Sequence, residues 1–201
     1  MRAKLSDGSR VILRPVSPED KSLIRHAFAR LSEESRYRRF FTPMTKLPET
    51  TLVYLTDVDH HDHEAIVAVP EDGVEVVGVA RYVRDQADPG VAEAAITVID
   101  DWQGRGLGGV LLRRLAARAR QEGVRRFTAL VKVENPAALE LLRGLGPTEI
   151  TRAGSEVELL IDLPRRGAGL KLARALRAAA AGTVSLADDM MRRVGGSGRA
   201  P

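Results

Sequence analysis

The sequence predicts an α/β protein, because strand-like and helix-like segments alternate along residues 10–163. Residues 93–99 are rich in Ala, Ile and Val, which predicts a mostly buried strand. Residues 110–119 then place apolar side chains at helical spacing. The predicted order of elements is strand, two helices, three strands, helix, strand, helix and two strands.

The first predicted strand covers residues 10–16 and ends near a proline. Ser17 is a good N-cap and Pro18 suits the first position of a helix, so a helix is expected to follow. A second helix restarts at Ser32. Its residues 36–41 mix arginines with aromatic side chains, which indicates a solvated basic side and aromatic side chains in the core.

Residues 59–64 (Asp-His-His-Asp-His-Glu) form the histidine-rich segment of the sequence. Imidazole and carboxylate groups are suitable zinc ligands. Consecutive residues rarely converge on one ion, however, and no distant partner is evident. We therefore expect a polar loop that enters a strand, and no metal site.

Two further strands are predicted at residues 64–69 and 74–84, around a turn that contains Pro70 and Gly73. The remaining predicted elements are a helix at residues 104–121, a strand at 126–133, a helix at 135–145, and strands at 148–152 and 156–163. Together they form one predicted domain, residues 1–163. Residues 164–201 are basic and rich in alanine, so we expect an amphipathic helical extension and a disordered tail.

The composition is that of an ordinary soluble protein, with 44% hydrophobic and 29% charged residues. The absence of cysteine excludes disulfides, thiolate metal sites and a cysteine nucleophile. Without a signal peptide or a long apolar run, we expect a cytoplasmic protein and no membrane partner. The net charge of +4 favours anionic partners, but 31 basic residues face 27 acidic ones and aromatic residues are only 4%, which argues against nucleic acid.

A glycine-rich segment connects the buried strand to the following helix: Gln103, Gly104, Arg105, Gly106, Leu107, Gly108 and Gly109. The first turn of a helix presents unpaired backbone N–H groups and the positive end of its dipole. Glycines let an anion approach these groups directly, and Arg105 adds a positive charge, so the loop suits a diphosphate. It lacks the GK[ST] ending of a P-loop and fits a dinucleotide motif poorly. A purely structural turn is the alternative.

The segment from Gln103 to Gly108 matches the Q/R-x-x-G-x-G/A signature of the GNAT superfamily of acetyl-coenzyme A-dependent N-acetyltransferases, and the sequence resembles that family over residues 10–163. The resemblance implies a mixed sheet with helices on both faces. It also implies acetyl-coenzyme A (acetyl-CoA) as the cosubstrate, with its diphosphate held by residues 103–109.

The same resemblance assigns further binding residues. In these enzymes the strand before the loop and the next strand splay apart, and the pantetheine arm pairs with exposed backbone in the gap. Thr97 and Val98 are thus expected to offer backbone N–H and C=O groups to the pantetheine. Asn135 stands at the family's asparagine position near the thioester arm, although Asn135 is also a good N-cap that needs no ligand.

A general base is expected because a lysine amine, with a pKa of ~10.4, is almost entirely protonated at neutral pH. Glu93 matches the position where a subset of GNAT protein acetyltransferases place a glutamate base; a glutamate that simply faces solvent is the alternative. Many family members carry a tyrosine seven residues after the asparagine as the acid for the leaving thiolate. Leu142 stands there in this sequence, so no side-chain acid is evident.

Residues 30–41 and 54–60, together with Glu93 and Leu142, resemble the catalytic domain of bacterial Pat-type protein lysine acetyltransferases. The resemblance implies acetylation of lysines in metabolic enzymes, acyl-CoA synthetases among them, with the two early helices along the acceptor groove. The alternatives are an enzyme that acetylates a small amine and a non-catalytic CoA-binding adaptor. A homodimer stays open.

Overall fold

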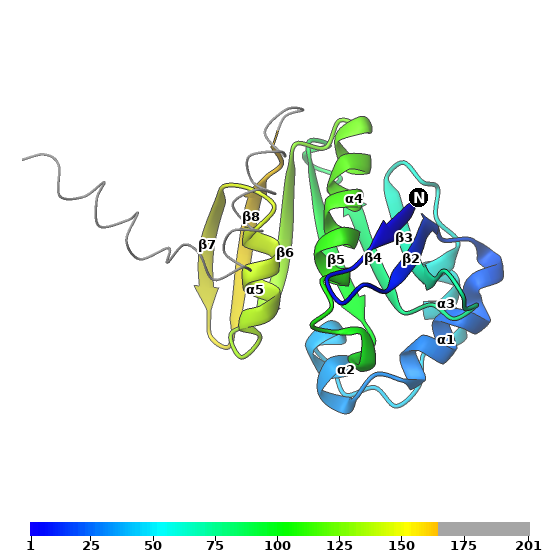
Figure 1. Cartoon of the computed structure of the whole chain (residues 1–201). Helices are drawn as coiled ribbons and strands as arrows, with labels where there is room; N and C mark the ends of the chain where they lie inside the picture. Colours follow the sequence, from blue (N-terminus) through cyan, green and yellow to red (C-terminus); the bar gives the residue numbers. More distant parts are fainter. Residues whose placement is uncertain (165–201) are drawn as a thin grey trace, which may run out of the picture. The chain divides into compact units, whose positions relative to one another are not determined.

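Eight strands form one mixed sheet in the computed structural model, which describes residues 1–164 (Figure 1). The strands are β1 (Arg2–Lys4), β2 (Arg10–Pro15), β3 (His63–Pro70), β4 (Gly78–Arg84), β5 (Val91–Val98), β6 (Arg126–Lys132), β7 (Thr148–Ala153) and β8 (Glu156–Asp162). They follow the order β1-β2-β3-β4-β5-β6-β8-β7 across the sheet. The predicted α/β class and mixed sheet are confirmed. The short β1 was not predicted, and the extension and tail predicted for residues 164–201 lie outside the described residues from 165 onward.

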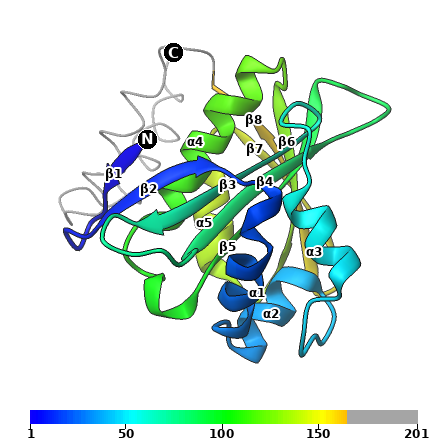
Figure 2. The same ribbon diagram turned by 90° about the vertical axis from the view of Figure 1, so that its right-hand side faces the viewer.

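Helices cover both faces of this sheet. They are α1 (Lys21–Ala29), α2 (Glu33–Phe40), α3 (Glu49–Thr56), α4 (Leu107–Gln121) and α5 (Pro136–Arg143), with short 3-10 helices η1 (Pro18–Asp20) and η2 (Asp100–Trp102). α4 and α5 lie on one face, and α1, α2 and α3 lie on the other (Figures 1 and 2). In the part of the chain that the structure describes, no helix has the length and apolar character needed to span a membrane.

The main core lies between α4 and the centre of the sheet. α4 buries one apolar stripe, including Leu111, Leu112 and Leu115, against β3, β4 and β5. The same strands are nearly continuous in Val, Ile and Ala because helices cover their other face as well. The sheet face is therefore a rigid support for the loop that leads from β5 into α4.

The neighbours β5 and β6 are the parallel pair of the sheet, and their pairing is short. It covers only residues 91–93 of β5 against residues 126–128 of β6. Beyond Glu93, β5 continues to Val98 alongside β4, whereas β6 continues to Lys132 alongside β8. The two strands therefore diverge, as expected from the resemblance, and one edge of β5 is left without a strand partner over residues 94–98.

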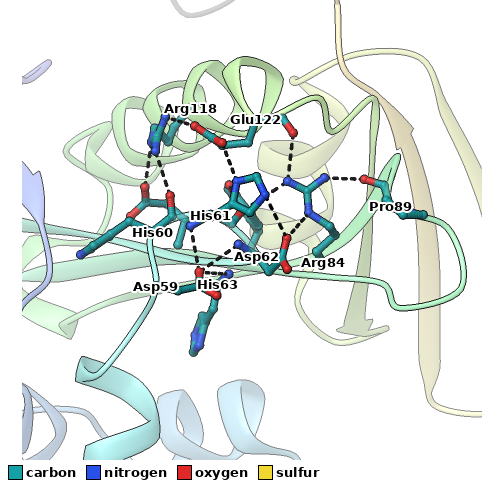
Figure 3. A network of polar contacts seen from close by, with 11 residues as sticks. Asp59, His60, His61, Asp62, His63, Arg84, Pro89, Arg118 and Glu122 are labelled. Carbon is teal, nitrogen blue, oxygen red and sulfur yellow. Dashed lines mark hydrogen bonds and ion pairs between the residues drawn. The ribbon is translucent and has the colours of Figure 1, made fainter.

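The histidine-rich segment forms a tight loop at the C-terminal end of α4 (Figure 3). The Asp59 carboxylate accepts hydrogen bonds from the backbone N–H groups of His61, Asp62 and His63 at 2.8–2.9 Å. His61 contacts Glu122 of α4, whereas His63 points away from that network. Within residues 1–164, no group of three or more histidine, cysteine or acidic side chains is placed to hold a metal ion.

Candidate active site

The loop between β5 and α4 depends on two glycines with left-handed backbone conformations. Gly104 has φ +72° and Gly106 has φ +81°, a region that residues with a Cβ rarely adopt. Gly106 is the N-cap of α4, and the next residue, Leu107, is buried and anchors the start of the helix. The glycine pattern of the sequence is thus required by backbone conformation at these two positions.

The first turn of α4 is open to a ligand. Because its N-cap is a glycine, no side chain of the cap residue accepts a hydrogen bond from the helix. The first helical bond joins the Val110 N–H to the Gly106 carbonyl at 3.3 Å, which leaves the amides of Leu107, Gly108 and Gly109 at the free end of the helix. Their partial positive charge favours an anion.

A groove of about 380 Å³ runs from this helix end to the edge of β5. Every binding residue predicted from the sequence except Arg105 lines it, namely Thr97, Val98, Gln103, Gly104, Gly106, Leu107, Gly108, Gly109 and Asn135. The sequence did not identify the other lining residues, which are Ser35, Arg38, Arg39, Ile96, Trp102, Ala137, Ala138 and Leu141. The groove thus combines four separate parts of the chain.

Arg105 is turned away from the groove lining. Its guanidinium group lies 3.3 Å from the Asp7 carboxylate and 4.8 Å from the centre of the Trp102 ring. The Arg105 carbonyl also accepts a hydrogen bond from Ser6 N–H at 3.1 Å. In this arrangement Arg105 holds the loop against the turn between β1 and β2.

The register of β5 decides which backbone groups face the gap. Ile99 N–H donates to the Val77 carbonyl on the β4 side at 3.1 Å. In an antiparallel ladder alternate residues point to the same side, so Thr97 also directs its N–H and C=O toward β4. Ile96 and Val98 direct theirs into the gap. Thr97 lines the groove, but of the two residues expected to present backbone groups to the gap only Val98 faces it, together with Ile96.

Asp100 joins the glycine loop to the start of α2. Its carboxylate accepts hydrogen bonds from Ser32 N–H at 2.6 Å, from the Ser35 hydroxyl, and from the Gln103 amide at 2.9 Å. Burial alone would raise the pKa of Asp100, but the bonds from Ser35 and Ser32 outweigh it and lower that pKa. Gln103 also donates to the Val98 carbonyl at 3.0 Å. This role of Asp100 could not be predicted from the sequence, because Ser32 and Ser35 are distant from it along the chain.

Asn135 caps α5, which begins at Pro136. Its side-chain oxygen accepts a hydrogen bond from Ala138 N–H at 3.1 Å, and the residue also lines the groove. The capping role predicted for Asn135 is confirmed. Its position leaves room for a second role toward a ligand in the groove, which stays a prediction.

Glu93 stands where β5 and β6 part. It pairs with Thr128 in the last register position before the strands diverge, and its side chain is exposed. It does not line the groove of the glycine loop. The negative charge of the Glu93 carboxylate acts on Arg39 of α2, where it opposes the lowering of the Arg39 pKa by burial.

Leu142 occupies the position at which many family members carry a tyrosine as the acid for the leaving thiolate, and the tyrosines Tyr82 and Tyr37 lie elsewhere in the fold. Leu142 is buried in the core. Tyr82 is also buried; its hydroxyl donates to the His61 carbonyl at 2.9 Å, and burial raises its pKa to about 12. Tyr37 is exposed on α2, where its ring lies beside Lys132 of β6.

The comparison with protein families decides the identity of this site. The model of the acetyltransferase (GNAT) family matches residues 25–146, which contain β5, the glycine loop, α4 and Asn135. The chain belongs to this family. It is therefore an acetyltransferase. Most residues of the family signature, Gln103 to Gly108, line the groove between α4 and β5.

Curated relatives and solved structures that resemble this GNAT acetyltransferase include proteins named Pat. It is 37% identical over 144 residues to an acetyltransferase of Pseudomonas aeruginosa, covering 71% of this chain and 77% of that protein. It is 36% identical over 152 residues to Acetyltransferase Pat of Mycolicibacterium smegmatis, covering 76% of this chain but only 45% of that protein. The crystal structure of the GNAT domain of S. lividans PAT matches with a TM-score of 0.75 at 31% identity, covering 81% of this chain and 96% of that one.

Proposed function

We propose that this GNAT enzyme binds acetyl-CoA in the groove and transfers the acetyl group to lysine side chains of proteins, with Glu93 as the general base. The observation that carries the proposal is the divergence of β5 and β6 beside the open first turn of α4. A diphosphate fits the helix end, where the glycines line the groove, and Arg38 and Arg39 also belong to the lining of the groove. The backbone groups of Ile96 and the N–H of Val98 face the gap, where an extended amide-containing arm can pair with them, while the Val98 carbonyl accepts from the Gln103 amide at 3.0 Å.

The chemistry needs an acyl donor and a neutral amine. Bound acetyl-CoA supplies a thioester carbon, to which the amine nitrogen bonds as the C–S bond breaks. Glu93 accepts the proton that the amine loses, directly or through a water molecule, at the point where the strands part. Leu142 offers no proton to the leaving sulfur, so water protonates the thiolate, whose pKa of about 8.5 makes it a fair leaving group.

The exposure of Glu93 supports a macromolecular acceptor. A lysine on a protein surface approaches from solvent, and an exposed carboxylate at the strand divergence is accessible to it. The resemblance to Pat-type enzymes in residues 30–41 and 54–60 supports the same class, with an acyl-CoA synthetase as the first acceptor to test. Relatives named Pat agree with this choice.

The proposal is tested with radiolabelled acetyl-CoA and three kinds of acceptor: a purified acyl-CoA synthetase, polyamines and aminoglycosides. We expect label in the synthetase, and about 100-fold slower transfer by Glu93→Gln, since a general base contributes at least about that factor. Calorimetry with acetyl-CoA is expected to give the same affinity for both proteins. Glu149→Gln, which changes an exposed strand glutamate on β7, serves as the matched control and keeps full activity.

Each alternative has its own outcome. Label only in a polyamine or an aminoglycoside contradicts the protein acceptor and supports a small-amine enzyme. Heat of acetyl-CoA binding without any transfer supports the non-catalytic adaptor. Unchanged turnover of Glu93→Gln at saturating substrate removes Glu93 from the mechanism.

A further inference from the structure

Two arginines line a small cavity on the sheet face opposite α4. The cavity has a volume of about 60 Å³ and lies between β4, β5 and the helices α1, α2 and α3. Its walls are mostly apolar, for example Phe28 and Leu55, but Arg39 of α2 and Arg81 of β4 also line it. Charged groups in such a cavity need a counter-charge, because desolvation of an ion is costly.

Arg81 has no such counter-charge among the described residues. Its side chain is only 5% exposed, and within residues 1–164 it makes no ion pair. One nitrogen, Nη2, reaches the Tyr54 carbonyl at 3.4 Å and contacts Nε2 of His63, while Nε is buried with no hydrogen-bond partner. His63 accepts from Arg81 only when neutral, and burial together with Arg81 lowers its pKa to about 4. Arg81, which lines the cavity, thus carries a buried guanidinium nitrogen without a hydrogen-bond partner.

Arg39 adds a second positive charge to the same space. Its guanidinium carbon lies 5.0 Å from the centre of the Phe40 ring, and the described residues give it no ion pair either. Burial lowers the pKa of Arg39, an effect that the Glu93 carboxylate opposes. Burial and the charge of Arg39 also lower the pKa of Arg81 to about 10. One carboxylate between the two guanidinium groups would offset both the desolvation and the mutual repulsion.

The cavity adjoins the groove of the glycine loop. Arg39 and Thr97 line both this cavity and the groove of the glycine loop. A cavity of this size holds about five non-hydrogen atoms, at roughly 10–15 Å³ for each water-sized unit. That is the size of the propionate end of a four-carbon dicarboxylic acyl group.

We propose that the cavity of Arg81 and Arg39 is a carboxylate-binding subsite, occupied by the carboxylate of a reactant in the transfer. The carboxylate belongs either to a dicarboxylic acyl group on coenzyme A or to an acceptor that carries its own carboxylate beside the amine. The assignment of a reactant rests on the proposed function, but carboxylate binding itself does not.

Binding is measured first, without any transfer. We expect sodium succinate to raise the melting temperature of the full chain, and succinyl-CoA to bind about tenfold tighter than butyryl-CoA in calorimetry. Arg81→Met is expected to remove both effects while acetyl-CoA affinity is retained. It is also expected to keep or raise the melting temperature without ligand, because it removes an uncompensated buried charge. Arg39→Met is the second variant and is expected to weaken succinate binding as well.

Arg84→Met is the matched control on the same strand. Arg84 is nearly as buried but pairs with Asp62 at 2.6 Å, so its loss is expected to lower the melting temperature and leave the succinate response intact. Equal affinities for succinyl-CoA and butyryl-CoA, with no succinate effect on melting, would overturn the subsite. A succinate response without transfer to any acceptor would overturn the proposed function and leave the subsite standing.

The source of the carboxylate is decided by two matched pairs of substrates. A preference for succinyl-CoA over butyryl-CoA as donor supports the acyl group. With acetyl-CoA as donor, a lower KM for free lysine than for cadaverine, which lacks only the carboxylate, supports the acceptor. Either preference must disappear in Arg81→Met, and its persistence there contradicts the proposal.

Discussion

Gly106 shows how a single residue sets the geometry of the glycine loop. With φ +81° at the N-cap of α4, it turns the chain so that the amides of the first helical turn point into the groove. An L-residue in this conformation is destabilised by about 1–2 kcal/mol. The space around it is not the constraint, since the nearest atom to an added Cβ is the Ser6 hydroxyl at 3.4 Å.

We therefore expect Gly106→Ala to lower the free energy of unfolding by about 1–2 kcal/mol and to raise the KM for acetyl-CoA. The measurements are urea denaturation and steady-state kinetics. Gly109→Ala is the control for stability. Gly109 lies within α4, and an added Cβ meets only the guanidinium end of the Arg113 side chain. Equal stability of Gly106→Ala and the parent protein would contradict the role given to the positive φ.

Asp20 is a second residue whose local contacts have a measurable consequence. It is buried, and both of its oxygens accept hydrogen bonds from the Arg14 guanidinium at 2.6 Å, with Ser17 N–H at 2.9 Å. Burial raises its pKa, but the bonds from Arg14 and Ser17 outweigh it, so the pKa of Asp20 lies below its ordinary value of 3.8. The folded state thus favours the ionised form.

A depressed pKa stabilises the fold above the pKa of the unfolded chain and loses that effect as the pH falls through the folded pKa. At pH 7, Asp20→Asn is expected to cost about 2 kcal/mol of unfolding free energy, typical of hydrogen bonds to a charged group. Below about pH 4 the difference from the parent protein is expected to shrink. Urea midpoints at pH 7 and pH 3 check this; a difference that stays constant would refute it.

At the scale of elements, the junction between the histidine-rich loop, β3 and α4 is held by one buried charge. Glu64 of β3 is 2% exposed, and its carboxylate contacts Arg118 Nε at 2.9 Å and His60 Nδ1 at 2.7 Å. Arg118 also donates to the His60 carbonyl at 2.8 Å and pairs with Glu122 (Figure 3). The end of α4 opposite the diphosphate site is thereby fixed to the sheet.

Arg118→Met is expected to cost about 3 kcal/mol, because it leaves the Glu64 carboxylate buried with a weaker counter-charge. The double variant with Glu64→Gln is expected to recover part of this loss. Arg25→Met removes an exposed arginine that pairs with Glu49 at 2.8 Å, and should leave the unfolding midpoint unchanged. Equal effects of Arg118→Met and Arg25→Met in thermal denaturation would show that burial does not matter here.

At the scale of the whole molecule, the groove exists because the parallel strands β5 and β6 pair over only three residues each and then diverge. β1 to β5 form one half and β6, β8 and β7 the other, and the strand pairing that joins them is the short one of residues 91–93 with residues 126–128. The groove uses the gap between the halves, while α2 and the carboxylate cavity lie toward the opposite face. One strand, β5, consequently carries Glu93, the proposed base, and contributes to both the groove and the cavity.

The sequence by itself determined the features that contiguous residues encode: the α/β class, most of the elements, the glycines at the start of α4 and the cap at Asn135. These depend on local periodicity, propensity and capping, which are read within a few residues. It also carried the family signature. The short β1, without a strong pattern over its three residues, was missed.

Only the tertiary structure decided which distant residues meet. The orientation of the Thr97 backbone depends on the register against β4, and the hydrogen bonds of Asp100 depend on the position of α2. Arg39, on the basic side predicted for α2, is half-buried and lines a cavity together with Arg81. For Thr97, a one-residue change of strand register would turn its backbone groups to the other side. These placements follow from how strands and helices pack, and no segment of the chain contains that information alone.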